Sequence, residues 1–263
     1  MSNVEKQHLL TARQMAQFVT DGFLKLEGLV PADLNQAVLA EQKTWEGAGY
    51  NFWTTSDRIR EVFDLPQVKG ALQSFVGVRP SYDHSFLHIV GPHKLTAQDW
   101  HADSIIDTRP YAFDIQAFYF SHDAPAEMGP TLVLPGSHLR KANTASIGRY
   151  KNIIGQRQLA ATAGTIVFMH HGIWHCAQPN HTDTTRYVFK LRMRPGQVQR
   201  NLFNTEGYDS EEVENIIAHG SQEWQGNEKR LEHVLRAMLW RYVSGDDTID
   251  FSFEKSLTRM SIH

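Results

Sequence analysis

Residues 186–193 have the sequence Arg-Tyr-Val-Phe-Lys-Leu-Arg-Met, in which apolar and basic side chains largely alternate. Successive side chains of a β-strand point to opposite faces, so this pattern predicts a strand with one apolar and one mainly basic face. The two faces carry Tyr187, Phe189, Leu191 and Met193 on one side, and Arg186, Val188, Lys190 and Arg192 on the other. We expect the apolar face to pack under helices. The basic face should begin inside a barrel at Arg186 and run out towards solvent.

Similar short extended runs occur upstream of this strand, and Gly, Pro and Asn separate them at Gly91-Pro92, Gly129-Pro130, Pro135-Gly136 and Pro179-Asn180. The clearest strands are predicted at residues 82–90, 111–121, 131–134, 164–169 and 187–193. Many short strands at fairly even spacing favour a sandwich or barrel over alternating strands and helices.

The two ends of the chain have a helical pattern instead. Apolar residues recur at helical spacing in 11–19, with Thr11 as a plausible N-cap, and in 223–243, which ends before Gly245. Pro31 and Pro66 mark the starts of two further helices, to about 45 and 76, and residues 23–26 are typical of a strand. We expect a single domain over 1–263, with N-terminal helices in 1–80, a β core in 81–195 and a C-terminal helical segment in 196–263.

Composition narrows the classes of protein to consider. The 263 residues are 41% hydrophobic and 21% charged, which is ordinary for a globular protein, and the formal net charge is −3. This charge gives no basic field for nucleic acid and no polybasic patch for a membrane. The N-terminus lacks the apolar core of a signal peptide, and Cys176 is the only cysteine, which excludes an intrachain disulfide. We therefore expect a cytoplasmic location.

The stretch Gln-Asp-Trp-His-Ala-Asp at 98–103 carries the candidate chemistry. On an extended segment His101 and Asp103 share a face, so one short piece of backbone offers two ligands to one metal ion. A third ligand must come from elsewhere, and His175 is the best candidate, although His170 and His171 lie nearby in sequence. Two histidines and one carboxylate on one side of the metal are typical of non-haem Fe(II) oxygenases.

Such an iron ion keeps three coordination positions open, of which two suit a 2-oxo acid and one suits dioxygen. The second carboxylate of a dicarboxylate needs its own anchor. A guanidinium is permanently charged and binds a carboxylate through two parallel hydrogen bonds. Arg186 begins the strand that follows His175 across a turn, so both side chains can reach one cavity.

These segments together resemble the phytanoyl-CoA dioxygenase family of Fe(II)- and 2-oxoglutarate-dependent oxygenases. The matching pieces occur in the family's order: Asp21-Gly22-Phe23, Trp100-His101-Ala102-Asp103, Gly129-Pro130-Thr131-Leu132-Val133-Leu134-Pro135-Gly136-Ser137-His138, His175-Cys176-Ala177-Gln178-Pro179-Asn180 and Arg186. The chain departs from the family at Ala177, where a hydroxyl side chain is common.

The resemblance implies a mainly β fold with flanking helices, built on a double-stranded β-helix (a jelly-roll, cupin-like core). It implies His101, Asp103 and His175 as iron ligands, Arg186 as the anchor for the distal carboxylate of 2-oxoglutarate, and Gln98 as a further partner of that co-substrate. The expected reaction hydroxylates a C–H bond of a small organic molecule, using Fe(II), 2-oxoglutarate and O2 and releasing succinate and CO2.

Two alternatives stay open at this point. One is a cupin-like metal-binding protein without oxygenase activity, and the other is a metal-dependent hydrolase with Zn(II) at the same ligands. The partner expected is a small-molecule substrate rather than nucleic acid or membrane, and a homodimer through the helix at 223–243 is the minority interpretation. We expect residues 46–80 and 196–222 to choose the substrate. His84 and His88, on one face of the strand at 82–90, are candidates for the pocket wall.

Overall fold

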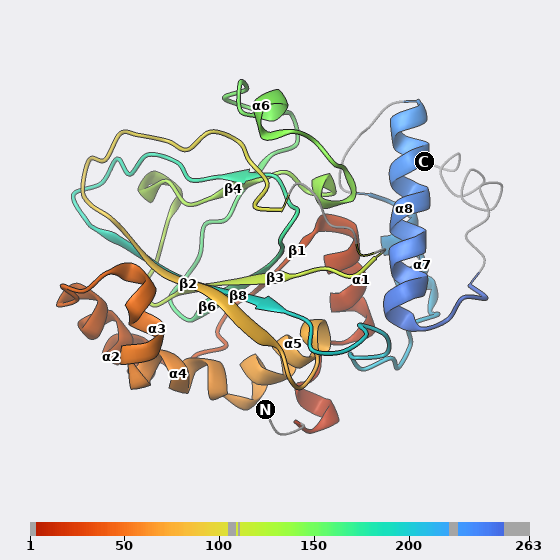
Figure 1. Cartoon of the computed structure of the whole chain (residues 1–263), viewed down its shortest axis with the longest axis horizontal. Helices are drawn as coiled ribbons and strands as arrows, with labels where there is room; N and C mark the ends of the chain where they lie inside the picture. The colour runs from red at the N-terminus through yellow and green to blue at the C-terminus, as the bar shows by residue number, and fades with distance from the viewer. Residues whose placement is uncertain (1–3, 105–108, 110, 221–225, 250–263) are drawn as a thin grey trace.

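The computed structural model describes residues 4–104, 109, 111–220 and 226–249. Two layers of antiparallel sheet face each other, with helices packed below the larger sheet and at one end of both (Figure 1). The helices are α1 (Ala12–Asp21), α2 (Ala32–Lys43), α3 (Phe52–Thr55), α4 (Asp57–Asp64), α5 (Pro66–Val76), α6 (Thr144–Ile147), α7 (Glu211–Ala218) and α8 (Asn227–Ser244).

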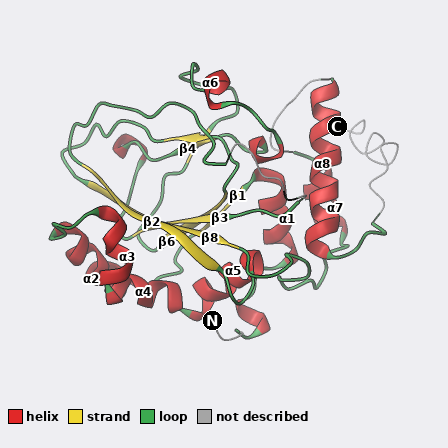
Figure 2. Cartoon of the chain, in the orientation of Figure 1, coloured by secondary structure: helices red, strands yellow, loops and turns green. Residues whose placement is uncertain are grey.

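The larger sheet has five strands in the order β1-β6-β3-β8-β2, and the smaller has three in the order β5-β4-β7. Figure 2 shows β4 above the strands of the larger sheet. All pairings within the two sheets are antiparallel, as expected for a jelly-roll core. The strands are β1 (Phe23–Leu26), β2 (Ser81–Val90), β3 (Ile115–Phe120), β4 (Leu132–Val133), β5 (Arg157–Gln158), β6 (Thr165–His170), β7 (His175–Cys176) and β8 (Arg186–Arg194).

Alternation along the central strands separates two apolar clusters. Phe189, Leu191 and Met193 of β8 belong to the large cluster under the helices, where Phe52 and Phe63 pack against the Phe189 ring at centroid distances of 5.9 and 5.8 Å. The opposite face of the sheet contributes to a smaller cluster between the two sheets, made of Phe23, Phe118, Phe120, Ala124, Val133, Leu159, Ala161, Val167, Met169, Ile173 and Val188. The predicted packing of the apolar face under helices is confirmed.

The N-terminal segment is part of this sheet rather than a separate layer. Thr11 caps α1 with a reciprocal capping box to Gln14, and Gly22 ends the helix in the left-handed conformation at φ 80°. A Cβ on Gly22 would lie 2.3 Å from Nδ1 of His138, so only glycine fits there. After this turn, β1 pairs antiparallel with β6 and forms the edge of the larger sheet. The strand expected at 23–26 is confirmed, and it joins the larger sheet at its edge although the β core was expected to begin at residue 81.

Several boundaries differ from the sequence prediction. The strand expected at 111–121 is shorter: Tyr111 has a positive φ of 63°, residues 112–114 have no regular structure, and β3 begins at Ile115. Pro31 is the N-cap of α2 rather than its first residue. The short strands β5 and β7 and the helices α4, α6 and α7 were not predicted. The first residues of the helix expected at 223–243 lie outside the described residues, and α8 begins at Asn227.

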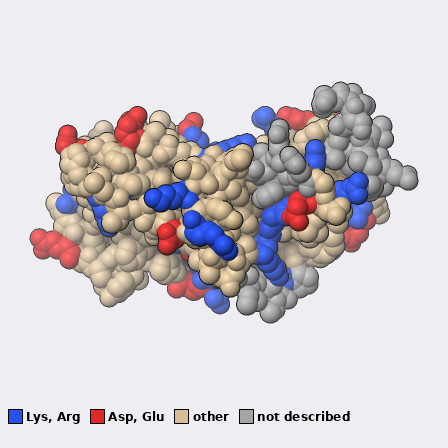
Figure 3. All heavy atoms as spheres, turned by 90° about the horizontal axis from the view of Figure 1, so that it is seen from above, with Lys and Arg blue, Asp and Glu red and all other residues tan. Residues whose placement is uncertain are grey.

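None of the described helices is both long and apolar enough to cross a lipid bilayer. Seen from above, with the smaller sheet towards the viewer, the surface carries basic and acidic side chains at intervals among uncharged ones (Figure 3).

Candidate metal centre

The backbone places the two candidate histidine ligands directly opposite each other. The N–H of His101 donates to the carbonyl of His175 at 3.0 Å, and the N–H of His175 donates back to His101 at 2.8 Å. Residues paired in this way in an antiparallel ladder project their side chains to the same side. The two imidazole centroids are consequently 4.4 Å apart, although the residues are far apart in sequence.

Asp103 completes a group of three. Its carboxylate oxygens lie 3.7 Å from Nε2 of His101 and 3.7 Å from Nε2 of His175. One ligand atom from each residue lies within 4.8 Å of the others, and this is the one such cluster found among the described residues. The three residues proposed from sequence as metal ligands are thus brought together.

Hydrogen bonds orient both imidazoles towards the centre of the group. Nδ1 of His101 donates to the carbonyl of Asp99 at 2.8 Å, and Nδ1 of His175 donates to the carbonyl of Ile173 at 3.0 Å. With the proton on Nδ1, each Nε2 presents a lone pair, as a metal-binding histidine requires. Burial lowers the pKa of His175 to about 4, so this imidazole is neutral near pH 7.

Two donors that the sequence analysis missed hold the carboxylate of Asp103. Gln116 Nε2 and Lys190 Nζ both donate to Oδ2, the latter at 2.9 Å. Burial alone would raise the pKa of Asp103, but the charge of Lys190 and that of His175 once it is protonated at low pH outweigh burial and keep the pKa below the usual range. Oδ2 is therefore saturated, and Oδ1 is the oxygen left to face a metal ion.

The side chain of Lys190 is more buried than the sequence predicted. The basic face of β8 was expected to run out to solvent, yet the Lys190 side chain is only 13% exposed because it pairs with Asp103. Gln116 is fully buried and also donates to Nδ1 of His171 at 2.7 Å. Alternation along β3 places Gln116 on the same face as Phe118, which was the available sequence signal for this residue.

A cavity of about 390 Å³ opens beside the three residues. Arg186 lines it and is 4% exposed; its Nη1 donates to the carbonyls of Met128, at 2.6 Å, and Gly129. Burial lowers the pKa of Arg186 to about 10, which leaves the guanidinium charged near neutral pH. Its buried Nε has no hydrogen-bond partner among the described residues. An N–H in this state is suited to a ligand carboxylate.

Of the other candidates for the cavity wall, Gln98 and His88 line the cavity and His84 does not. Gln98 lines the cavity, and its side-chain oxygen accepts from the N–H of Ala177 at 3.1 Å. His88 also lines it, and burial lowers the pKa of His88 to about 4. His84 is not among the lining residues; it is exposed and stacks on Phe86.

None of the described residues of 46–80 and 196–222 lines this cavity, so their expected role in choosing the substrate stays a prediction. The described residues that line it come from 86–103, 118–131 and 175–190. Helices α4 and α5 belong to the large apolar cluster on the opposite face of the sheet, and α7 packs beside α1. The apolar residues of α4 and α5 therefore pack on the face of the sheet that lies away from this cavity.

Other polar residues of the matching segments have structural contacts. His170 packs against Phe18 and Phe113, so it lies outside the metal group, as does His171. The side-chain amide of Asn180 donates to the backbone carbonyl of Thr184 in its own loop and to those of Val90 and Gly91. The thiol of Cys176 is buried, and burial raises its pKa to about 11.

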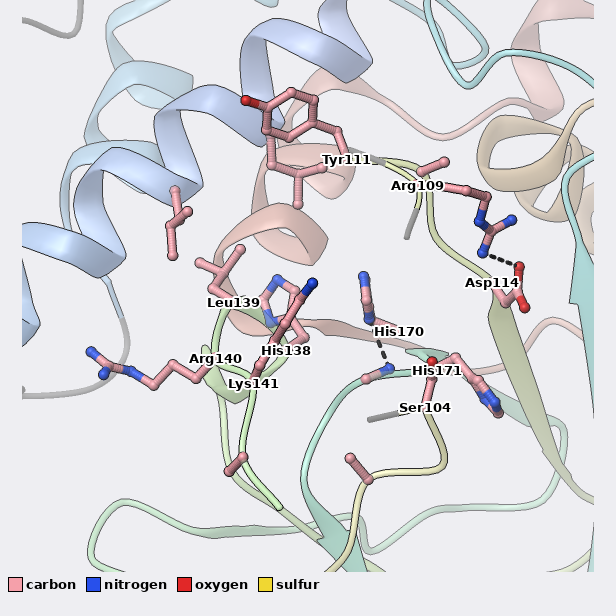
Figure 4. A pocket seen from close by; sticks show the side chains of 16 residues that line it. Ser104, Arg109, Tyr111, Asp114, His138, Leu139, Arg140, Lys141, His170 and His171 are labelled. Carbon is pink, nitrogen blue, oxygen red and sulfur yellow. Dashed lines mark hydrogen bonds and ion pairs between the residues drawn. The ribbon is translucent and has the colours of Figure 1, made fainter. Parts of the chain in front are cut away.

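A second cavity, of about 240 Å³, lies on the other side of the ligand-bearing segment (Figure 4). Ala102 and Ser104 line it, whereas His101 and Asp103 line the first cavity, as strand alternation requires. Its far wall comes from Leu235 and Leu239 of α8. The metal group therefore faces the first cavity, and the second lies between the ligand-bearing segment and part of α8.

Comparisons with solved structures find the same fold. A non-heme monooxygenase, ThoJ in its apo form, is 20% identical with a TM-score of 0.60, over 68% of this chain and 76% of that one. The 2-oxoglutarate-dependent epimerase SnoN from nogalamycin biosynthesis is 20% identical with a TM-score of 0.58, over 70% and 82%. HygX from Streptomyces hygroscopicus, with nickel and 2-oxoglutarate bound, is 13% identical with a TM-score of 0.62, over 71% and 87%.

A comparison with curated protein sequences gave no match. The family model for phytanoyl-CoA dioxygenase (PhyH), in contrast, matches residues 53–188. This stretch is just over half of the chain and contains the three clustered residues, Gln98 and Arg186. The chain belongs to the phytanoyl-CoA dioxygenase family.

Proposed function

We propose that this protein is an Fe(II)- and 2-oxoglutarate-dependent dioxygenase that hydroxylates a C–H bond of a small organic molecule. The observation that carries the proposal is the meeting of three side chains, His101, Asp103 and His175, at the wall of a cavity that also contains the buried cation Arg186. Family membership makes the protein an oxidoreductase, and its neighbours of similar fold include enzymes described with 2-oxoglutarate bound.

The donor set fits ferrous iron. Two neutral imidazoles and one carboxylate form the two-histidine, one-carboxylate triad of non-haem Fe(II) oxygenases. The Nε2 atoms of His101 and His175 and Oδ1 of Asp103 would hold the ion, since the other polar atoms of these side chains already have partners. Such outer partners fix the orientation of ligands and contribute to metal affinity.

The cavity also fits 2-oxoglutarate. Arg186 is charged and buried in the same cavity as the triad, and its Nε–H has no partner among the described residues. We propose that this guanidinium binds the distal carboxylate, and that Gln98, which lines the same cavity, is a second contact for the co-substrate. Ala177 has no hydroxyl to donate to the co-substrate, so we propose that this hydrogen bond comes from another residue of the cavity.

Iron and 2-oxoglutarate, when bound, supply the oxidising chemistry: the co-substrate gives succinate and CO2, and one oxygen atom of O2 enters the substrate. The side chains position the reactants. Asp103 and the two histidines fix the metal against one wall, Arg186 orients the co-substrate, and Phe86, Phe118 and Val188 provide an apolar wall that limits access of water.

The alternative functions explain fewer of these contacts. Asp103 is the one carboxylate among the described residues that line the cavity, and it is committed to the triad, so a hydrolase would lack a carboxylate general base. A metal-binding protein without oxygenase activity would have no use for a buried guanidinium with an unpaired N–H.

The decisive experiment first measures the binding of 2-oxoglutarate to the Fe(II) protein and then its conversion to succinate. Purified protein with Fe(II) and 2-oxoglutarate, kept anaerobic, should develop the visible charge-transfer band of a 2-oxo acid chelated to iron. Under air, succinate should form and should increase with a suitable member of a substrate panel. H175A should lose both signals, whereas H170A, a matched nearby histidine outside the triad, should keep the band. A wild-type protein that binds Fe(II) but neither forms the band nor releases succinate refutes the proposal.

We also propose that the chain forms one domain, because the largest apolar cluster contains residues from α1, β8 and α8 together. A homodimer and a cytoplasmic location stay predictions from the sequence.

A further inference from the structure

The inner face of the larger sheet presents one cation between two aromatic rings. In the register of the central strands, Lys190 of β8 is paired with Phe86 of β2 on one side and with Phe118 of β3 on the other. Partners in an antiparallel ladder project to the same face. All three side chains line the cavity of the metal group, and Nζ of Lys190 lies 5.7 Å from the centroid of the Phe118 ring. The ammonium is thus held in an aromatic setting beside the metal ligands.

The hydrogen bonds of this ammonium leave capacity for a ligand. A lysine ammonium has three N–H donors. One is used at 2.9 Å by Oδ2 of Asp103, which is the hydrogen-bond partner that the described residues supply to Nζ. The other two donors lie on a side chain that is 13% exposed and lines the cavity. A largely buried cation with unused donors is stabilised by an anion that enters the cavity.

The excess of basic over acidic side chains around the cavity also favours the binding of an anion beyond 2-oxoglutarate. Among the described lining residues, Lys94, Arg186 and Lys190 are basic, and only Asp103 is acidic. A divalent metal ion would share the charge of Asp103, and the two carboxylates of 2-oxoglutarate would be committed to the metal and to Arg186. Lys190 would then face the remaining space with no full counter-ion, and positive potential in a cavity selects anionic ligands.

Resting on the proposed function, we propose that Lys190 is a specificity-determining residue that binds the carboxylate of the primary substrate. The substrate class is a small organic acid whose apolar or unsaturated body lies against Phe86 and Phe118. Both rings have a face or edge in the cavity, and the whole cavity of about 390 Å³ has to hold the co-substrate as well. The acid must therefore be small.

The competing explanation is that Lys190 serves only as a counter-ion that positions Asp103. The two roles differ in what a charge-removing substitution changes. A positioning role affects the metal and its spectrum whatever the charge of the substrate. A substrate-binding role affects the discrimination between an acid and its neutral isostere.

The test uses 3-phenylpropanoate and 3-phenylpropanamide, which are matched in size and shape but differ in charge. Protein loaded anaerobically with Fe(II) and 2-oxoglutarate is titrated with each, and binding is followed by the change in the charge-transfer band. Wild type should bind the acid about tenfold or more tightly than the amide, the ratio expected for a charge-assisted hydrogen bond. K190M should lose that preference, K190R should keep part of it, and K94M, which removes an exposed cation of the same cavity, should retain it.

The outcomes separate this inference from the proposed function. If the band does not form in wild type, the proposed function fails and the inference falls with it. If the band forms but wild type shows no preference for the acid, including the case in which neither probe binds, the inference alone is overturned. A K190M protein that retains the acid preference overturns it too. If K190M no longer binds iron, and K190R binds iron but lacks the acid preference, Lys190 serves only to position Asp103, and the inference is overturned.

Discussion

Replacement of Arg186 by methionine should weaken the binding of 2-oxoglutarate far more than it weakens the binding of iron. Methionine keeps much of the apolar length of the side chain and removes the charge. Truncating one partner of a buried, hydrogen-bonded charge pair costs about 2–5 kcal/mol. Because about 1.4 kcal/mol is a factor of ten in affinity, the dissociation constant should rise roughly 30-fold to 5,000-fold. Arg186 is 4% exposed, so little solvent screening reduces this effect.

The same substitution should also lower stability. Arg186 donates to the carbonyls of Met128 and Gly129, which methionine leaves without that donor. Each buried group deprived of its partner costs about 1–3 kcal/mol. For a chain of this length a loss of 1 kcal/mol lowers the unfolding midpoint by about 2–4 °C, so a drop of several degrees is expected. The binding assay must therefore be run well below the midpoint of the variant.

The assay is an anaerobic titration of the Fe(II) protein with 2-oxoglutarate, followed by the charge-transfer band, with iron affinity measured separately. K94M is the matched control: Lys94 lines the same cavity but is exposed, so its removal should change affinity by less than about 1 kcal/mol. R186K should be intermediate, because lysine restores the charge without the paired donors. If folded R186M binds 2-oxoglutarate as tightly as wild type, Arg186 is not the anchor.

Three further predictions concern stability. G129A should destabilise the fold by about 2 kcal/mol or more, seen as a lower unfolding midpoint, because φ is 64° and the new Cβ would lie 1.8 Å from the carbonyl oxygen of Pro179. Without metal, the free energy of unfolding should fall as the pH drops from about 6.5 towards 4: burial lowers the pKa of His88 to about 4, so the unfolded chain binds more protons in this range, and H88F should flatten the slope. T11A should cost about 1 kcal/mol through loss of the N-cap of α1, and T11S, which keeps the hydroxyl, should not.

Local patterns predicted the parts of the fold that depend on local chemistry. The alternation along 186–193 was sufficient to assign the buried face of β8, because a strand with one face in a core has a fixed side-chain period. β1 and α5 have the bounds expected from Gly22 and Pro66, since these residues act on neighbouring φ and ψ angles. The two-residue strands β5 and β7 have no such period, because long-range pairing alone defines them.

The candidate site shows the same division. His101 and Asp103 are linked by spacing, and His175 by its distance to Arg186 in the matching segments, so the sequence was sufficient to propose the group. The partners of Asp103 come from two different strands, 13 and 87 residues away. Lys190 stands in a basic row that local alternation alone would place at the edge of a barrel. The register between β2, β8 and β3 places it between Phe86 and Phe118, and its hydrogen bond to Asp103 depends on the long-range fold.

The alternation of side chains along residues 101–104 determines which of them can reach the metal site. His101 and Asp103 face the first cavity, and Ala102 and Ser104 face the second, in a segment that pairs with His175 through His101. A shift of one residue in that pairing would turn both ligands away from His175 and expose Ala102 to the metal position. The reciprocal hydrogen bonds between His101 and His175 therefore fix the register of the whole ligand-bearing segment. They decide which side chains of the segment reach Lys190 and Arg186, and hence where a metal ion and two anionic ligands could meet.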